Sequence, residues 1–84
     1  VNKESFLSLN CLLLTSLPDN VINKFTWIEE LQLIGNQISN ISGYLFKNLK
    51  NLKNLILSQN QVLNIEDSSF DDLIKLEFNF LFHK

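Results

Sequence analysis

The sequence has few of the residues that build disulfide frameworks, metal centres and tight turns. Its 84 residues include one cysteine, one proline, two glycines, one histidine and no methionine. A lone thiol, Cys11, cannot close an internal disulfide and supplies too few ligands for a zinc site. A partner thiol outside this segment is the alternative for Cys11. These shortages exclude a disulfide-stapled scaffold, and we expect neither a metal nor a cofactor.

Excess charge and long apolar runs are also missing. The formal net charge is −2 and the isoelectric point is near 5.2, so nothing attracts the chain generally to nucleic acid phosphates or anionic lipid. No stretch reaches the 18 or so apolar residues that a membrane helix needs. With 45% hydrophobic and 19% charged residues, the composition is that of one small folded domain. We expect no nucleic acid partner and no membrane insertion by this segment.

Catalytic motifs are not found either. The sequence contains no glycine-rich phosphate loop, no HExxH and no GxSxG. Glu29 and Glu30 are adjacent in a predicted strand, where neighbouring side chains point to opposite faces, so they are not expected to form a carboxylate pair. His83 has no cysteine or histidine near it in the sequence. The sequence therefore predicts a protein that is not an enzyme.

What the sequence does have is a 24-residue repeat. Two windows that begin at Ile28 and Leu52 carry the same class of residue at eight positions. The pairs are Ile28 and Leu52, Leu31 and Leu55, Leu33 and Leu57, Asn36 and Asn60, Ile38 and Val62, Ile41 and Ile65, Phe46 and Phe70, and Leu49 and Leu73. Chance rarely places asparagine and phenylalanine in the same slots of both windows. A period of this length is the signature of a repeat architecture.

The repeat continues in both directions, with one departure on each side. Toward the amino terminus, Leu12 stands where the asparagine is expected, and toward the carboxyl terminus Asn79 stands where a leucine is expected. Phe78, Phe80 and Phe82 stand at every second position, and Asn79 lies between the first two. A last strand whose register is shifted by one residue is therefore an alternative. We expect a single segment with repeats at about 4–27, 28–51 and 52–75 and a partial repeat at 76–84.

The pattern LxxLxLxxNxIxxIxxxxFxxL resembles the 24-residue leucine-rich repeat of extracellular and receptor proteins. The stretches WIEELQLIGNQISNISGYLFKNL and NLKNLILSQNQVLNIEDSSFDDL match it nearly throughout. The opening LNCLLLTSLPDNV is similar to the junction between an amino-terminal cap and a first repeat, without the cysteine cluster of that cap. The resemblance implies an α/β right-handed solenoid of about three and a half repeats, with short parallel strands on its concave face.

Each part of the repeat has a physical reason. Leu31, Leu33 and their equivalents at +24 should point inward from short strands, because side chains alternate along a strand. Asn36 and Asn60 should form a ladder, because an amide offers both a donor and an acceptor to buried backbone groups where the chain turns. Phe46 and Phe70 should stack on the convex side. The convex segments, roughly 43–50 and 67–74, are expected to be irregular, 3-10 or short helical turns.

The concave face is the predicted binding surface. The residues between and beside the inward leucines should face outward, and their positions follow from the strand register alone. The candidate ligand-binding residues among them are Glu30, Gln32, Ile34, Asn54, Ile56, Ser58, Phe78, Phe80 and Phe82. Exposed apolar clusters on a rigid sheet often mark interaction sites, and aromatic residues are enriched at interface hot spots. The alternatives are that Ile34 and Ile56 are isolated surface residues and that the three phenylalanines form the core of an irregular final turn.

One motif bears on location. Asn40, Ile41 and Ser42 form an N-glycosylation sequon, and Asn40 should face solvent because it precedes the inward Ile41. The sequon adds weight to an extracellular or cell-surface location, with a cytoplasmic one as the alternative.

The primary hypothesis is a module that binds another protein, as part of an extracellular or cell-surface receptor-like protein. The alternatives are spacer repeats with no ligand of their own and an intracellular repeat scaffold. Repeat arrays need polar caps, and the sequence shows no clear one at either end, so flanking repeats or caps of a longer array are expected.

Overall fold

A computed structural model describes residues 5–18 and 20–80, with residues 78–80 described by their backbone alone. The elements in this part of the chain are short, and the one helix among them is a single 3-10 turn, η1. In chain order they are β1 (Phe6–Ser8), η1 (Ile22–Lys24), β2 (Glu30–Gln32), β3 (Asn40–Ile41), β4 (Asn54–Ile56), β5 (Asn64–Ile65) and β6 (Phe78–Phe80).

Four of the strands form a parallel sheet in the order β1-β2-β4-β6. Their register follows the repeat: Leu7 pairs with Leu31, and Leu31 pairs with Leu55. Parallel neighbours need a long crossover between them, and here each crossover is the remainder of one 24-residue repeat. The strands are therefore short because each repeat contributes one strand and then turns away from the sheet.

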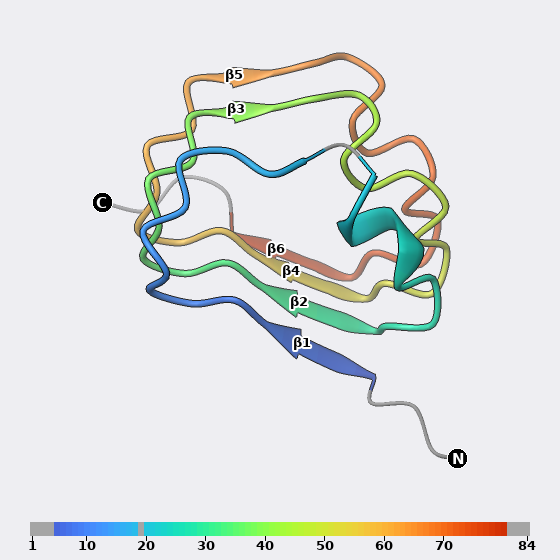
Figure 1. Cartoon of the computed structure of the whole chain (residues 1–84). Coiled ribbons are helices and arrows are strands. Elements are labelled where there is room, and N and C mark those ends of the chain that lie inside the picture. Colours follow the sequence, from blue (N-terminus) through green and yellow to red (C-terminus); the bar gives the residue numbers. More distant parts are fainter. Residues whose placement is uncertain (1–4, 19, 81–84) are drawn as a thin grey trace.

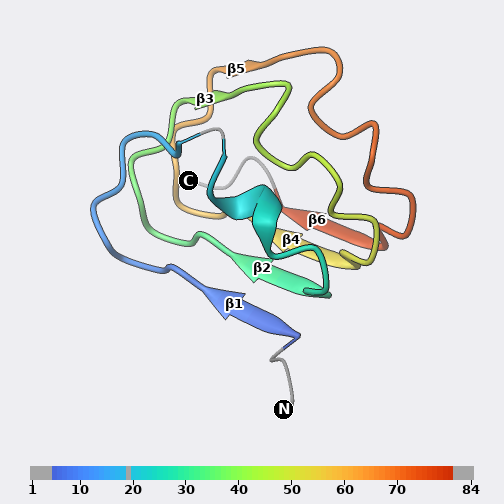
Figure 2. The ribbon, with the colours of Figure 1, turned by 45° about the vertical axis from the view of Figure 1, so that its right-hand side comes forward.

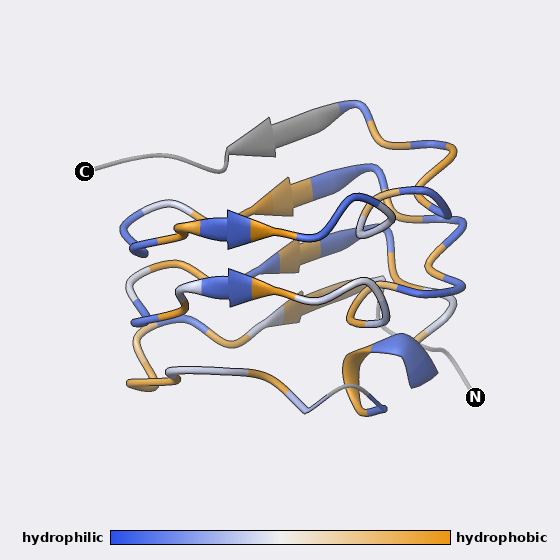
Figure 3. Ribbon diagram, turned by 90° about the horizontal axis from the view of Figure 1, so that it is seen from above, coloured by the Kyte–Doolittle hydropathy of each residue, from blue (hydrophilic) through white to orange (hydrophobic). Residues whose placement is uncertain are grey.

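The crossovers form the other sides of the molecule. Strands β3 and β5 pair in parallel as a second, two-stranded sheet, with Asn40 opposite Asn64 and Ile41 opposite Ile65. Figures 1 and 2 show this sheet facing the four-stranded one, with the chain passing from one to the other in successive stacked coils. Figure 3 shows hydrophilic and hydrophobic residues in the same order on β3 and β5.

The core lies between the two sheets. Leu31, Leu33, Leu55 and Leu57 are fully buried, as the period-two pattern of the strands predicts. The rings of Phe46 and Phe70 stack with centroids 6.0 Å apart and planes 17° from parallel. The other buried apolar side chains are Ile22, Ile28, Ile38, Ile41, Leu45, Leu49, Leu52, Val62 and Leu73. Equivalent positions of successive repeats thus fill one continuous core.

The buried asparagine Asn36 joins two coils. Its Nδ2 donates to the carbonyl of Leu9 in the preceding coil, at 2.9 Å, and to that of Leu33 in its own, at 3.2 Å. Its Oδ1 accepts from the backbone N–H groups of Leu12 and Leu14, both at 3.0 Å. One amide therefore satisfies backbone groups that the turn after β1 removes from the sheet.

Asn60 does the same one coil later. Its Nδ2 donates to the carbonyls of Leu33 and Leu57, at 2.7 and 3.2 Å, and its Oδ1 accepts from the N–H of Ile38 at 3.0 Å. Leu33 and Ile38 stand 24 residues after Leu9 and Leu14, so the two asparagines serve equivalent backbone groups. Each asparagine therefore joins its own coil to the one before it through hydrogen bonds.

The short helical turns expected at 43–50 and 67–74 are not helices. Their backbone bonds span three residues and occur at every second residue, as from Lys47 N to Tyr44 O and from Leu49 N to Phe46 O. A segment of successive turns covers more distance per residue than an α-helix, which rises about 1.5 Å per residue. Asn48 also has a φ of 67°, which a right-handed helix cannot contain. Both segments therefore have the irregular form, which was one of the three forms expected.

The last strand pairs in the unshifted register. The backbone of Phe78 lies opposite Asn54, Asn79 opposite Leu55 and Phe80 opposite Ile56. The one-residue shift considered from the alternating phenylalanines is therefore wrong for the backbone pairing. The 24-residue step decides the register because it sets the length of chain between consecutive strands.

A left-handed residue follows the strand in each of three coils. Cys11, Gly35 and Gln59 have φ values of 56°, 72° and 60°, and they stand 24 residues apart. Only glycine adopts this conformation without a steric penalty, and other residues lose about 1–2 kcal/mol there. The sequence satisfies this requirement once and accepts strain twice.

We predict that Asn60→Leu lowers the free energy of unfolding by about 2–4 kcal/mol, because it leaves buried backbone groups of Leu33 and Ile38 without their amide partner. Asn51→Leu, at an exposed asparagine, should cost at most about 1 kcal/mol. Chemical denaturation followed by circular dichroism measures both. Equal losses for the two variants would count against the bridging role of the buried amide.

We also predict that Gly35→Ala costs about 1–2 kcal/mol, because alanine is strained at this φ and its Cβ would lie 3.0 Å from Cys11 Sγ. The converse change, Gln59→Gly, should raise stability by up to about 1 kcal/mol, because relief of strain exceeds the added chain entropy. The same denaturation curves measure both changes. A Gly35→Ala chain as stable as its parent would refute the strain argument.

Candidate functional site

The side of the four-stranded sheet that faces away from the core is the candidate binding surface, here called the outer sheet face. The alternation of side chains along each strand identifies this face. Leu31 and Leu55 are fully buried, and the residues on either side of each are half-buried. Its described side chains are Phe6, Ser8, Asn10, Glu30, Gln32, Ile34, Asn54, Ile56 and Ser58. The three coils thus bring six of the predicted site residues to one face, together with three residues of the first coil.

A chain of hydrogen bonds crosses this face. Asn54 Nδ2 donates to Glu30 Oε1 at 3.2 Å, and Gln32 Nε2 donates to Glu30 Oε2 at 2.7 Å. Asn10 Nδ2 donates to Gln32 Oε1 at 2.9 Å, and Asn10 Oδ1 accepts from the N–H of Ile34 at 2.7 Å. Polar side chains of three consecutive coils therefore hold one another in fixed orientations.

The apolar part of the face lies beside this chain. Ile56 is opposite Gln32 in the register of β2 and β4, and Ile34 follows two residues after Gln32. Both isoleucines are half-buried, and Phe6 on β1 is 47% exposed. The outer sheet face therefore carries an apolar area next to a single carboxylate.

The predicted phenylalanines fall at the far end of this surface. In the backbone pairing, Phe78 takes the position next to Asn54, and Phe80 the position next to Ile56. Phe82 lies outside the described residues. By register, Phe78 and Phe80 belong to the same columns as Glu30 and Gln32.

The adjacent glutamates Glu29 and Glu30 have different surroundings. Glu29 Oε1 lies 3.8 Å from Lys53 Nζ in an ion pair whose side chains are about half exposed. The carbonyl of Glu29 also accepts from the N–H groups of Lys53 and Asn54, at 2.7 and 3.0 Å. Glu29 therefore marks the start of the strand, whereas Glu30 lies on the sheet face.

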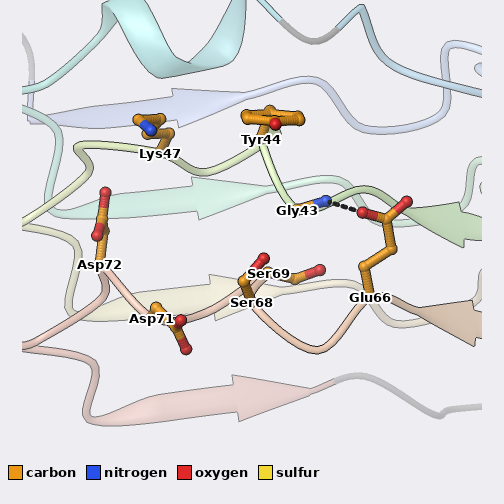
Figure 4. A pocket seen from close by; sticks show the side chains of 8 residues that line it. All are labelled: Gly43, Tyr44, Lys47, Glu66, Ser68, Ser69, Asp71 and Asp72. Atoms are coloured by element: carbon orange, nitrogen blue, oxygen red, sulfur yellow. Dashed lines mark hydrogen bonds between the residues drawn. The ribbon is translucent and has the colours of Figure 1, made fainter.

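A hollow of about 250 Å³ lies between residues 43–47 of one connecting segment and residues 66–72 of the next. Figure 4 shows Gly43, Tyr44 and Lys47 on one coil and the residues of the next coil across from them. The N–H of Gly43 donates to Glu66 Oε1 at 2.8 Å, and Lys47 Nζ lies 5.7 Å from the centre of the Tyr44 ring. The bond between Gly43 and Glu66 joins neighbouring coils, whereas Lys47 and Tyr44 interact within one coil.

The sequon asparagine Asn40 is exposed on the second sheet. Its Oδ1 accepts a hydrogen bond from Asn64 Nδ2 at 2.9 Å. A glycan attaches to the amide nitrogen, so this bond to the oxygen does not conflict with attachment. Asn40 is on the opposite side of the molecule from the outer sheet face (Figure 1).

Two polar residues have structural roles that were not predicted from the sequence. Asn10 orients Gln32, and its signal was its position in the same column as Ile34 and Ser58. Ser69 replaces the leucine of the preceding coil, Leu45, and is buried, with Oγ 3.2 Å from the carbonyl of Ile41 and 3.1 Å from that of Ser42. The turns expected over 67–74 gave no indication that Ser69 would be buried and would donate to these carbonyls.

Residues 5–18 and 20–80 contain neither a cluster of metal-binding side chains nor a membrane-spanning helix. No group of three histidine, cysteine or acidic side chains comes close enough to hold a metal ion. None of the helices there has the length and apolar character needed to cross a membrane. Cys11 is exposed and forms no disulfide within the described residues.

Comparison with known proteins gives two matches and one negative result. Residues 26–81 match the family model described as leucine rich repeat. A 56-residue stretch, 67% of this chain, is 39% identical to the leucine-rich repeat-containing G-protein coupled receptor 5 of Xenopus tropicalis, but it spans only 6% of that protein. No solved structure matches the chain significantly. The family model covers two thirds of the chain, so the chain belongs to the leucine-rich repeat family.

Proposed function

We propose that this chain is a protein-interaction module that binds a macromolecular partner through the outer sheet face. In this proposal the coils form a right-handed solenoid of about three and a half repeats, and the outer sheet face is its concave side. Right-handed crossovers are the rule for parallel strands in one sheet. The binding residues are Glu30, Gln32, Ile34, Asn54, Ile56 and Ser58, with Phe78, Phe80 and Phe82 extending the surface.

The observation that carries the proposal is the placement of Ile34 and Ile56. Both project from a sheet whose other side is packed with fully buried leucines, so the surface that holds them is rigid. A rigid surface loses little conformational entropy on binding, which favours affinity. An apolar area rimmed by polar residues is typical of an interaction site.

The proposed setting is an extracellular or cell-surface protein. The Xenopus tropicalis protein that the chain resembles is named a G-protein coupled receptor, which supports this setting. The chain spans 6% of that receptor, so the setting rests on similarity over a short segment. Neither the composition nor the site residues favour an enzyme, and we propose no catalytic role.

We predict that Ile34→Glu combined with Ile56→Glu abolishes binding, because two charges replace the apolar area and would lose hydration at the interface. The chain is immobilised and used to select binders from a library of displayed random peptides. The parent should enrich binders, and the double variant should not bind them. Thermal denaturation should be nearly unchanged, because both side chains lie outside the core.

The matched control is Leu63→Glu combined with Ile74→Glu. These two apolar residues are 80% and 72% exposed and lie outside the strands of the four-stranded sheet. This variant should bind the selected peptides as the parent does. If the control and the test variant lose binding equally, or if the parent enriches nothing, the outer sheet face is not the binding surface and the spacer function is favoured.

We further predict that secretion from a eukaryotic cell yields chain carrying an N-glycan on Asn40, because the sequon is exposed on β3. Treatment with a glycosidase that cleaves N-glycans should reduce the apparent mass, and Asn40→Gln should prevent the larger form. The peptide binding defined above should be the same with and without the glycan, because Asn40 lies opposite the outer sheet face. Secreted chain without glycan at Asn40 would contradict the proposal.

A further inference from the structure

The outer sheet face carries a carboxylate whose charge is not neutralised. Glu30 accepts from Asn54 and Gln32, and both donors are neutral amides. In the described part of the chain, the structure pairs Lys53 with Glu29 and places no lysine at ion-pair distance from Glu30. The two amides fix the position of the carboxylate and leave it negatively charged.

The hydrogen-bond chain has only one possible direction. At one end the backbone N–H of Ile34 can only donate, and at the other the ionised Glu30 can only accept. Asn10 must therefore turn its oxygen toward Ile34, and Gln32 must turn its nitrogen toward Glu30. Both ends enforce the same orientation, so the carboxylate is held before any partner arrives.

The carboxylate still has capacity for a partner. Its two oxygens offer about four acceptor positions, and the structure shows two of them in use. A charge held in place on a half-buried sheet surface attracts a cation more strongly than a solvated one, because less ordering and less solvent screening oppose the pair. Ile56 lies opposite Gln32, one step along the face from Glu30, and Ile34 follows two residues after Gln32. These isoleucines offer contact to an apolar side chain or to the methylene stem of a lysine.

We propose that Glu30 selects the partner: the outer sheet face takes a protein segment that places a lysine or arginine next to an apolar side chain. This inference rests on the proposed function and adds the chemistry of the ligand to it. Charge complementarity decides the occupant. The described side chains of the outer sheet face include no lysine or arginine, so a second copy docked face to face would bury two carboxylates with no cation from either face to pair them.

The test uses the same displayed peptide library and compares the parent chain with Glu30→Gln and Glu29→Gln. The parent should enrich peptides with a basic residue beside an apolar one. Glu30→Gln should weaken the best peptide by about 10–100-fold, because a charge-assisted hydrogen bond is lost. Glu29→Gln removes the same charge at the exposed start of the strand and should change affinity less than about threefold.

A second measurement keeps the test valid if Glu30→Gln fails to fold. The basic residue of the selected peptide is replaced by glutamine and bound to the parent chain. The same 10–100-fold loss is expected, together with a weaker dependence of affinity on salt. Size-exclusion chromatography of the parent should give a monomer, and a dimer that Glu30→Gln strengthens would make a second copy the occupant and overturn the proposal.

The possible failures are distinguishable. If the parent enriches peptides without basic residues and the Ile34 and Ile56 variant loses them, the outer sheet face binds but Glu30 does not select. If Glu30→Gln binds the enriched basic peptides as tightly as the parent, the proposal is also overturned. If nothing is enriched, both this inference and the proposed function fail.

Discussion

The first two coils of this protein depend on the satisfaction of backbone groups that leave the sheet. A strand of three residues ends after one step, and the turn that follows buries N–H and C=O groups where no neighbouring strand can reach them. Each such group costs about 1–3 kcal/mol if left without a partner. The amides of Asn36 and Asn60 supply these partners from the following coil, so the ladder also fixes the 24-residue step between coils. The paired leucines then fill one core because the step repeats.

The parts of the structure that could be predicted are those that repeat. Leu31, Leu55 and their neighbours alternate along short strands, and their inward direction followed from that alternation alone. The convex segments were predicted less well. Serine and aspartate at 67–69 favour a helix start, but the chain must span the distance between two sheets in few residues, and turns do so better than a helix. Local preference lost to the geometry of the coil.

Single positions that depart from the repeat were harder to interpret. Ser69 in place of leucine is buried because its hydroxyl meets carbonyls of the preceding coil, a partner that no pattern within the repeat contains. Cys11 and Gln59 in a left-handed position show that the backbone conformation belongs to the coil, whichever residue occupies it. The hydrogen-bond chain on the outer sheet face was missed for a similar reason. Residues in neighbouring columns were identified separately, and their contacts required side-chain directions that register does not supply.

The separation of the buried core from the outer sheet face explains how such a module could acquire a ligand. Inward positions are constrained by the ladder and the core, so a change at Asn60 or Leu55 disturbs two coils at once. Outward positions on the same strands contact the core little and can differ from coil to coil, as Glu30 and Asn54 do in one column. Glu30 accepts from an amide of its own coil and from one of the following coil, and Asn10 of the preceding coil orients the first of these amides. If this face binds a partner as proposed, its specificity would come from three coils together, which a single repeat could not provide.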